Sequence, residues 1–496
     1  MGLVAETTAG KVCGTEVEDG VLIWRGIPYA AAPVGPLRWR LPQPPESWSG
    51  VRDATGWGAP SVQPPMPGGD LVGAPVSPPP PPPAEDCLFV NVTAPADAQE
   101  RPVLVWLHGG GYQIGSGTDI AGAGIAFAQS HGVVVVTFNY RLGALGFLSL
   151  DGEETTGAYG LHDQIALLRW VRENIASFGG DPGQVTIYGV SAGAKSVGNL
   201  MGSPLARGLF RRAASSSGGA EYVATPQQSA AVARRFFREL GTGGGPLREV
   251  SAQDVLHAQQ AIADGICGTW VWRPAIDGLA LNRRPVDAIA AGEAAGIALL
   301  AEHCIDECGL YQLMEPDSAD QADRVLEDYF GTAGRNDILA AYAAARPHAA
   351  DDPRQLRIDI MTDERYAIPT TRLADAQSTH APVWRSRFDG PLTGLPAQIA
   401  HGRARPAFHG SDTPLVWNGG SGVADQLHNA WGAFITGGNP LAAGLPPWPE
   451  YTPAERLTMI FAADGAHVEP DPDAARRTAW DGRDWQPGTW YQVDGI

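Results

Sequence analysis

The sequence predicts an α/β protein in which helices cover a central, mostly parallel β-sheet. Continuous apolar runs rich in β-branched residues, at 103–107 and 133–136, are typical of central strands buried on both faces. A third short strand is expected at 184–188, and helices are expected at 119–130 and 161–178. In the second helix the apolar residues follow helical spacing, and Gly179 stands at its C-terminal stop. Strand and helix therefore alternate, which is the signature of a mostly parallel sheet.

The regions outside this alternation differ from it in composition and in hydrophobic pattern. Residues 1–60 alternate apolar and polar residues between turns, which predicts short antiparallel strands. Residues 61–84 end in six prolines, 78–83, which we expect to form a stiff surface loop, with a protein-binding motif as the alternative. Residues 225–290 are more helical and form a candidate cap or insertion. We interpret residues 1–496 as one domain.

Composition and charge exclude several classes of function. A formal net charge of -19 argues against nucleic acid or an anionic membrane as a partner. No apolar run approaches the ~20 residues of a membrane span, and the N-terminus lacks the pattern of a signal peptide. The sparse cysteines suggest reduced thiols and a cytoplasmic location, and their spacing predicts no metal site. These cysteines are Cys13, Cys87, Cys267, Cys304 and Cys308.

A serine between two glycines is the first candidate for chemistry. The motif GVSAG, 189–193, follows a predicted strand and precedes a run of small residues. At such a junction G-x-S-x-G is typical of a nucleophile elbow, because the tight turn needs small neighbours. Ser191 is therefore the predicted nucleophile. The alternative is a small residue where a strand meets a helix.

A glycine-rich segment after an earlier strand supplies the second candidate. HGGGY, 108–112, lets backbone N–H groups approach a substrate oxygen without side-chain clash. Such donors stabilise the oxyanion of an acyl-transfer transition state by about 3 kcal/mol each. The N–H groups of Gly110, Gly111 and Ala192 are the predicted oxyanion hole.

Longer segments resemble the type-B carboxylesterase and cholinesterase family. The stretch at 26–55 is similar to the family's N-terminal segment, and EDCLFVNV at 85–92 and FGGDPGQVTIYGVSAG at 178–193 are similar to its two signatures. The resemblance covers nearly the whole chain. It implies an α/β-hydrolase fold with helical insertions, no metal or organic cofactor, and a catalytic triad in the order Ser, Glu, His.

The resemblance assigns the other two triad members. The acid usually lies in a segment ending Asp-Glu, and IALLAEHCIDEC places it at Glu307. The histidine usually follows small residues and precedes an acidic residue and a proline, which places it at His409 in RPAFHGSDTP. His303 is the rival base, but it lies four residues from the acid, a poor geometry for orienting an imidazole.

Several positions depart from the family pattern. Val190 replaces the usual Glu before the nucleophile, and we expect this to change the pH profile or the rate without abolishing hydrolysis. Lys195 is unusual on the helix after the elbow. Before and after the acid, Glu302, His303, Cys304 and Cys308 stand where the family has glycine and threonine residues. The position that pairs with Cys87 in secreted relatives looks like Ser61, which fits a reducing compartment.

The expected function is carboxylic-ester hydrolysis through an acyl-enzyme, on small to medium apolar or aryl esters. Carbamate, amide or lactone hydrolysis is the alternative within the same chemistry, because the triad and oxyanion hole serve all acyl transfers. A non-catalytic interaction protein is the alternative in another class. The expected partner is a small-molecule ester, and a monomer and a homodimer both remain open.

Overall fold

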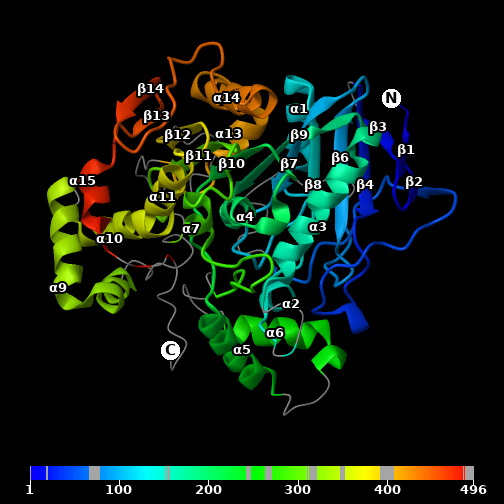
Figure 1. Ribbon diagram of the computed structural model, residues 1–496, viewed down its shortest axis with the longest axis horizontal. Helices are drawn as coiled ribbons and strands as arrows, with labels where there is room; N and C mark the ends of the chain where they lie inside the picture. Colours follow the sequence, from blue (N-terminus) through cyan, green and yellow to red (C-terminus); the bar gives the residue numbers. More distant parts are fainter. Residues whose placement is uncertain are drawn as a thin grey trace.

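The computed structural model describes residues 2–17, 20–65, 79–150, 152, 157–241, 247–262, 271–309, 311, 321–346, 352–390, 407–483, 485 and 487. Within them an eleven-stranded sheet runs through the centre of the molecule (Figure 1). Its strands in spatial order are β14 (Gly465–Pro470), β13 (Leu457–Ala462), β12 (Val383–Phe388), β11 (Ala298–Cys304), β10 (Arg212–Ser216), β9 (Gly180–Val190), β7 (Arg101–Leu107), β8 (Val134–Phe138), β6 (Phe89–Pro95), β4 (Val21–Pro28) and β3 (Thr15–Val17).

The sheet is parallel in its middle and antiparallel at its two ends. Every neighbouring pair from β13 to β8 is parallel, whereas β14–β13, β8–β6, β6–β4 and β4–β3 are antiparallel. A small second sheet contains β1 (Val4–Thr7), β2 (Gly10–Cys13) and β5 (Val51–Asp53). The predicted mostly parallel sheet with antiparallel N-terminal strands is confirmed, with the difference that β5 pairs parallel to β2.

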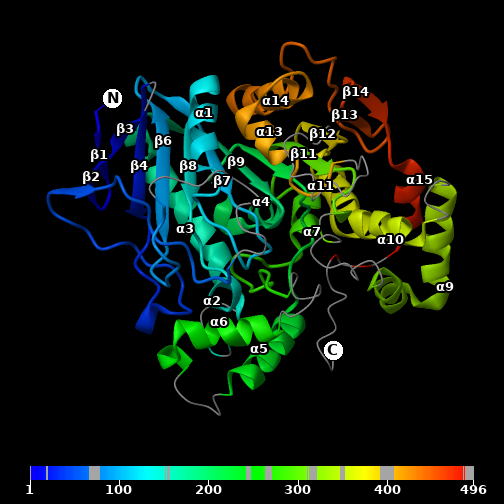
Figure 2. The same cartoon turned by 180° about the vertical axis from the view of Figure 1, so that it is seen from behind.

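Helices cover both faces of the large sheet, as Figures 1 and 2 show from opposite sides. The predicted helices are α1 (Ala121–His131) and α3 (Tyr159–Asn174), which continues as a 3-10 turn, η3 (Ile175–Phe178), and ends at Gly179 with φ 82°. Alternate residues of β7 face two separate apolar clusters, because successive strand side chains point to opposite faces. Helix α3 packs into the first cluster, and α1 and α14 (Val423–Gly437) pack into the second.

The remaining helices surround this core. They are α2 (Gly143–Phe147), α4 (Ala192–Met201), α5 (Pro226–Leu240), α6 (Ala252–Ile262), α7 (Pro285–Ala290), α9 (Gln321–Ala345), α10 (Pro353–Thr362), α11 (Ile368–Gln377), α13 (Thr413–Asn418) and α15 (Ala474–Arg477), with a π-helix η8 (Asp363–Ala367) and 3-10 turns η2 (Gly35–Leu37), η4 (Pro204–Ala206), η5 (Leu247–Glu249) and η9 (Thr478–Trp480). Helices α5 and α6 pack together at the bottom of Figure 1. The cap interpretation of 225–290 stays a prediction.

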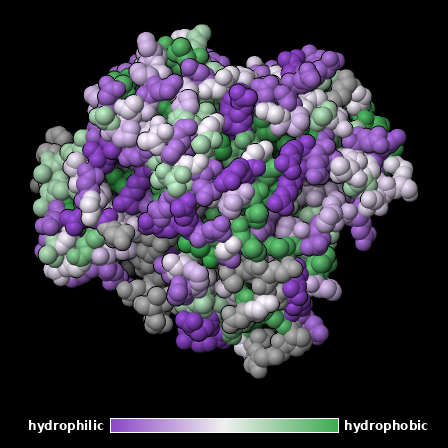
Figure 3. Space-filling view, in the orientation of Figure 1, coloured by the Kyte–Doolittle hydropathy of each residue, from purple (hydrophilic) through white to green (hydrophobic). Residues whose placement is uncertain are grey.

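The surface in Figure 3 is mostly hydrophilic, with smaller apolar areas between the polar side chains. In the part of the chain that the structure describes, no helix has the length and apolar character needed to cross a membrane. Pro79 to Pro83 form no strand, while Pro78 and Cys267 lie outside the described residues.

Candidate active site

The site lies where four neighbouring parallel strands end. The strands β7, β9, β10 and β11 are in register: Leu107 and Ser215 both pair with Gly189, and Ser216 pairs with Glu302. The carboxyl ends of parallel strands share one edge of a sheet, where open α/β sheets place their ligands. The segments that leave these four strands carry the predicted loop 108–111, Ser191, Ser217 and Glu307.

The turn that carries Ser191 is strained and closely packed. Ser191 has φ 59° and ψ −123° and stands at the N-terminus of α4. A Cβ atom on Gly189 would lie 2.3 Å from the carbonyl carbon of Gly193, and one on Gly193 would lie 2.0 Å from the Leu107 carbonyl oxygen. Only glycine fits at both positions. The turn therefore holds Ser191 in a backbone conformation that a non-glycine residue seldom adopts. Strained conformations of this kind are often found at functional residues.

The glycine loop lies directly against this turn. A Cβ atom on Gly109 would lie 3.3 Å from the Cβ of Ser191. Gly110 and Gly111 have φ values of 98° and 61°, a region that favours glycine. The loop is held by N–H groups of residues 113 and 114 that donate to the Gly110 carbonyl, at 3.0 and 3.1 Å. The structure thus brings the loop, the serine and the start of α4 together.

The structure also brings the predicted acid and base together. Nδ1 of His409 lies 2.6 Å from Oε2 of Glu307. Their loops are joined by backbone hydrogen bonds from His409 N to the Glu307 carbonyl, at 3.3 Å, and from Asp306 N to the Ala407 carbonyl, at 2.9 Å. A carboxylate in this place fixes the imidazole tautomer and stabilises an imidazolium.

Two further donors hold the second oxygen of Glu307. The Ser217 hydroxyl donates to Oε1 at 2.6 Å, and the backbone N–H of Cys304 donates to the same atom at 2.7 Å. Burial alone would raise the pKa of Glu307, but His409, Ser217 and this N–H group outweigh burial, and the pKa is lowered. Glu307 is therefore a carboxylate at neutral pH.

Sequence reasoning missed Ser217, Tyr311 and Tyr366. Ser217 has φ 60° directly after β10, and its signal was the run SSSGG at 215–219. The ring of Tyr366, on the π-helix η8, lies 4.6 Å from the His409 ring, and the ring of Tyr311 lies 5.8 Å from it. Both distances are between ring centroids. These tyrosines form one wall beside the imidazole.

The rival histidine has other partners. His303 lies on β11, where its Nδ1 is 3.0 Å from Nη1 of Arg385 and its Nε2 is 3.6 Å from Oδ2 of Asp473. Burial, and then the charge of Arg385, lower its pKa to about 4. It is therefore neutral at physiological pH and is oriented by these two side chains.

Two departures from the family pattern lie in one row across the sheet. Ser216 of β10 pairs with Val190 on one side and with Glu302 on the other. Both side chains are buried, and Glu302 is hydrogen-bonded to Asp412, three residues after His409, and accepts from the Ser386 hydroxyl at 3.0 Å. The acid Glu302 thus lies in the same row as Val190, two strands away from it.

The described cysteines, Cys13, Cys87, Cys304 and Cys308, are free thiols. Cys87 is hydrogen-bonded to Ser61, so the two positions that the resemblance relates are in contact. Among the described residues no group of three or more His, Cys, Asp or Glu side chains is placed to hold a metal ion.

Comparisons with known proteins agree with this geometry. A model of the carboxylesterase family matches residues 2–480. The para-nitrobenzyl esterase of Bacillus subtilis (strain 168) is 37% identical over 506 positions that cover 96% of this chain and 97% of that protein. The phenmedipham hydrolase of Pseudarthrobacter oxydans is 34% identical, covering 94% and 97% of the two chains.

Solved structures give the same result. A PNB esterase superposes with a TM-score of 0.82 at 36% identity, covering 97% of this chain and 100% of that one. A carboxylesterase of Geobacillus stearothermophilus gives 0.83 at 36% identity, covering 96% and 100%. The fold is thus an α/β-hydrolase fold, and the molecule is an acyl-bond hydrolase by class. The chain belongs to the carboxylesterase family and is a carboxylic ester hydrolase.

Proposed function

We propose that Ser191, His409 and Glu307 form the catalytic triad of this esterase, and that Gly110, Gly111 and Ala192 form its oxyanion hole. The observation that carries the proposal is the 2.6 Å contact between His409 and a buried, ionised Glu307, at the sheet edge where Ser191 begins α4.

Each group then has one role. His409 takes the proton of the Ser191 hydroxyl, which attacks the ester carbonyl. Glu307 stabilises the imidazolium as it forms. The N–H groups of Gly110, Gly111 and Ala192 donate hydrogen bonds to the oxyanion, and the N-terminus of α4 adds a favourable partial charge. His409 returns the proton to the leaving alcohol, and water hydrolyses the acyl-enzyme in a second cycle.

The proposed substrates are small to medium apolar or aryl esters. The tyrosine wall beside His409 supports an aryl or apolar body, since aromatic faces pack well against such groups. The name of the para-nitrobenzyl esterase agrees with this class. We also propose a cytoplasmic location, which the free thiols support.

Hydrolysis of p-nitrophenyl esters from acetate to decanoate tests the proposal, with wild type, Ser191→Ala and a control, Ser378→Ala. Ser378 ends α11 and precedes β12, at the opposite edge of the sheet. We expect Ser191→Ala to lose at least 10³-fold in kcat, and the control to keep the wild-type rate. Turnover that survives Ser191→Ala would refute the triad. If wild type cleaves carbamates, amides or lactones and not these esters, the bond type is wrong and the triad stands.

A further inference from the structure

His108 is buried where β7 passes into the glycine loop. It follows Leu107, the last residue of the strand, and is 1% exposed. Its ring stacks on the ring of Tyr140, with centroids 4.3 Å apart and planes inclined by 17°, and the Tyr140 hydroxyl donates to the His108 carbonyl at 3.1 Å. Because burying a polar ring without hydrogen bonds is costly, the partners of this imidazole indicate what it does.

One nitrogen of the ring has a close partner. Nδ1 lies 2.9 Å from the carbonyl oxygen of Gly109, and since a carbonyl oxygen only accepts, Nδ1 must carry the proton. Nε2 has no hydrogen-bond partner among the described residues. Burial lowers the pKa of His108, while Asp119 acts in the opposite direction more weakly. The ring is therefore neutral and donates from Nδ1.

The Gly109 carbonyl belongs to the same peptide unit as the Gly110 N–H. A peptide unit is planar and trans, so its C=O and N–H groups point in opposite directions. A hydrogen bond that holds the carbonyl therefore also sets the direction of the N–H group. This restraint matters in a run of glycines, because the backbone there has more conformations to choose from than at other residues.

The next peptide unit of the loop is held in the same way by the backbone. The Gly110 carbonyl accepts from the N–H groups of residues 113 and 114, and this sets the direction of the Gly111 N–H. Among the described residues, neither the Gly110 nor the Gly111 N–H donates to a protein acceptor. His108 thus supplies for the first of these two N–H groups the restraint that the backbone supplies for the second.

Gly115 lies against both ends of the His108 hydrogen bond. A Cβ atom on Gly115 would lie 2.5 Å from Nδ1 of His108 and 2.7 Å from the Gly109 carbonyl oxygen. Gly115 is held in turn by Gln63, whose side chain accepts from the Gly115 N–H at 2.8 Å and donates to its carbonyl at 3.0 Å. The imidazole is thus packed between Tyr140 on its face and Gly115 at its Nδ1 edge.

We propose that His108 is a positioning residue for ester hydrolysis, whose Nδ1–H holds the Gly109–Gly110 peptide unit so that the Gly110 N–H points at the oxyanion. This inference rests on the proposed function and adds a residue to it. His108 touches no reacting atom and acts through the peptide unit. Because the ester oxygen becomes an oxyanion only in the transition state, loss of the restraint should lower kcat and leave KM nearly unchanged.

Leucine and asparagine at this position separate the hydrogen bond from the packing. Both side chains branch at Cγ, and asparagine can place Nδ2 where His108 has Nδ1, whereas leucine places a methyl group there. Both lose the ring that stacks on Tyr140, so this loss cancels when the two are compared. With p-nitrophenyl butyrate we expect kcat of His108→Leu to be about tenfold to hundredfold below that of His108→Asn, since losing a whole oxyanion donor costs about 10²- to 10³-fold.

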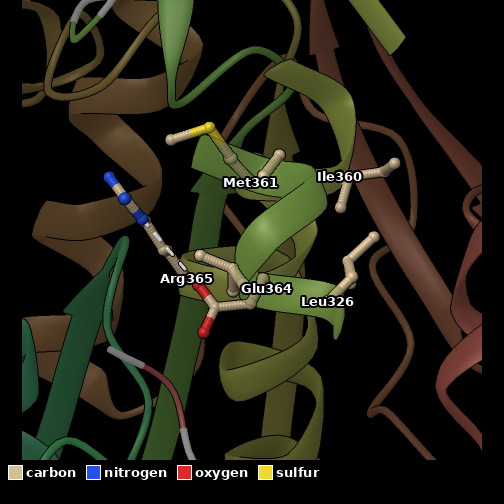
Figure 4. A pocket seen from close by; sticks show the side chains of 7 residues that line it. Leu326, Ile360, Met361, Glu364 and Arg365 are labelled. Atoms are coloured by element: carbon tan, nitrogen blue, oxygen red, sulfur yellow. Dashed lines mark ion pairs between the residues drawn. The ribbon is translucent and has the colours of Figure 1, made fainter. Parts of the chain in front are cut away.

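Two controls separate this effect from a general loss of stability. His467→Leu, on the exposed strand β14, should keep the wild-type rate. Leu326 is buried in an apolar pocket between α9 and α10, which Figure 4 shows, and α9 lies apart from β7 in Figures 1 and 2. Leu326→Ala should therefore lower the stability of the fold and leave kcat unchanged.

A ketone inhibitor measures the oxyanion hole without turnover. Ser191 Oγ adds to the carbonyl carbon of 1,1,1-trifluoro-2-octanone, its proton passes to His409, and the carbonyl oxygen becomes an oxyanion. The methyl ketone 2-octanone has the same chain and serves as the probe for binding without this adduct. The inhibition constant of the trifluoro ketone should be higher for His108→Leu than for His108→Asn by the factor that separates their kcat/KM values, and that of 2-octanone should be equal for both.

Equal kcat values for the two variants, or equal inhibition by the trifluoro ketone, would overturn the inference. Protein with ¹⁵N-labelled histidine adds a spectroscopic readout, in which the signal lost in His108→Asn should show the proton on Nδ1. A proton on Nε2 would contradict the proposed hydrogen bond. If Ser191→Ala turns over like wild type, the proposed function fails and the inference with it, whereas equal variants in an enzyme that needs Ser191 refute the inference and leave the triad intact.

Discussion

The buried acid pair of Glu302 and Asp412 makes stability depend on pH in a defined direction. Burial, and then the neighbouring Asp412, raise the pKa of Glu302 well above its usual range. We therefore expect Glu302 to stay protonated in the folded protein at neutral pH and to donate to Asp412. In the unfolded chain the same group ionises near pH 4.5. The folded state thus holds a proton that the unfolded state releases.

The size of the effect follows from linkage. Where the folded state binds one proton more, the free energy of unfolding falls by about 1.4 kcal/mol for each pH unit. The contribution of the pair is full below pH 4.5 and is lost progressively as pH rises toward the raised pKa. Glu302→Gln keeps a donor for Asp412 and an acceptor for the Ser386 hydroxyl, which donates to Glu302 at 3.0 Å. It removes the titratable proton of Glu302, because an amide does not ionise in this pH range. Glu302→Leu leaves Asp412 without this donor and should cost about 1–3 kcal/mol.

Equilibrium urea unfolding at pH 5.5, 6.5 and 7.5, followed by tryptophan fluorescence, measures this. We expect wild type to lose stability with rising pH relative to Glu302→Gln, and the difference between the two proteins to shrink as pH falls toward 4.5. Other titrating groups are common to both proteins and cancel in the difference. Parallel curves for wild type and Glu302→Gln would show that Glu302 is charged in the fold, and the reasoning would be refuted.

Two further predictions concern the triad and the elbow. Glu307→Gln should lower kcat by about 10³- to 10⁴-fold because His409 loses the carboxylate that orients it, while Glu469→Gln, on the exposed strand β14, should keep the wild-type rate; a loss below tenfold would contradict the role of Glu307. Val190→Glu should retain hydrolysis but lower the free energy of unfolding by about 1–3 kcal/mol, because it buries a carboxyl group, and should move the acid limb of the kcat/KM pH profile. An unchanged kcat and pH profile would show that Val190 has no part in the pH response.

The sequence was sufficient for the features that depend on local pattern. The runs at 103–107 and 133–136 are strands because β-branched residues suit a sheet buried on both faces. Helix α3 and its stop at Gly179 follow from apolar spacing and one left-handed glycine. Ser191 and the glycine loop were evident because a tight turn and a close backbone approach restrict the residue types allowed.

Contacts between distant segments were beyond such patterns. His409 was assigned by resemblance, since spacing alone does not select one histidine among eleven. The contact of Ser217 with Glu307 depends on β10 lying between β9 and β11, which no local pattern records. The acid pair of Glu302 and Asp412 depends on the same strand order, and the place of Tyr366 beside His409 depends on a π-helix between α10 and α11.

The shared edge of β7, β9, β10 and β11 fixes the positions of the groups at the strand ends, and it leaves the residues on the covering helices free to vary. Neighbouring strands lie about 4.8 Å apart, so the lateral repeat of the sheet sets the spacing of the proposed oxyanion loop, nucleophile and acid. The Tyr366 ring beside His409 comes instead from the π-helix η8, which packs against β11. Evolution can therefore exchange residues on such a covering helix, and redirect the enzyme to another ester, while the proposed reactive groups keep the spacing that the strands impose.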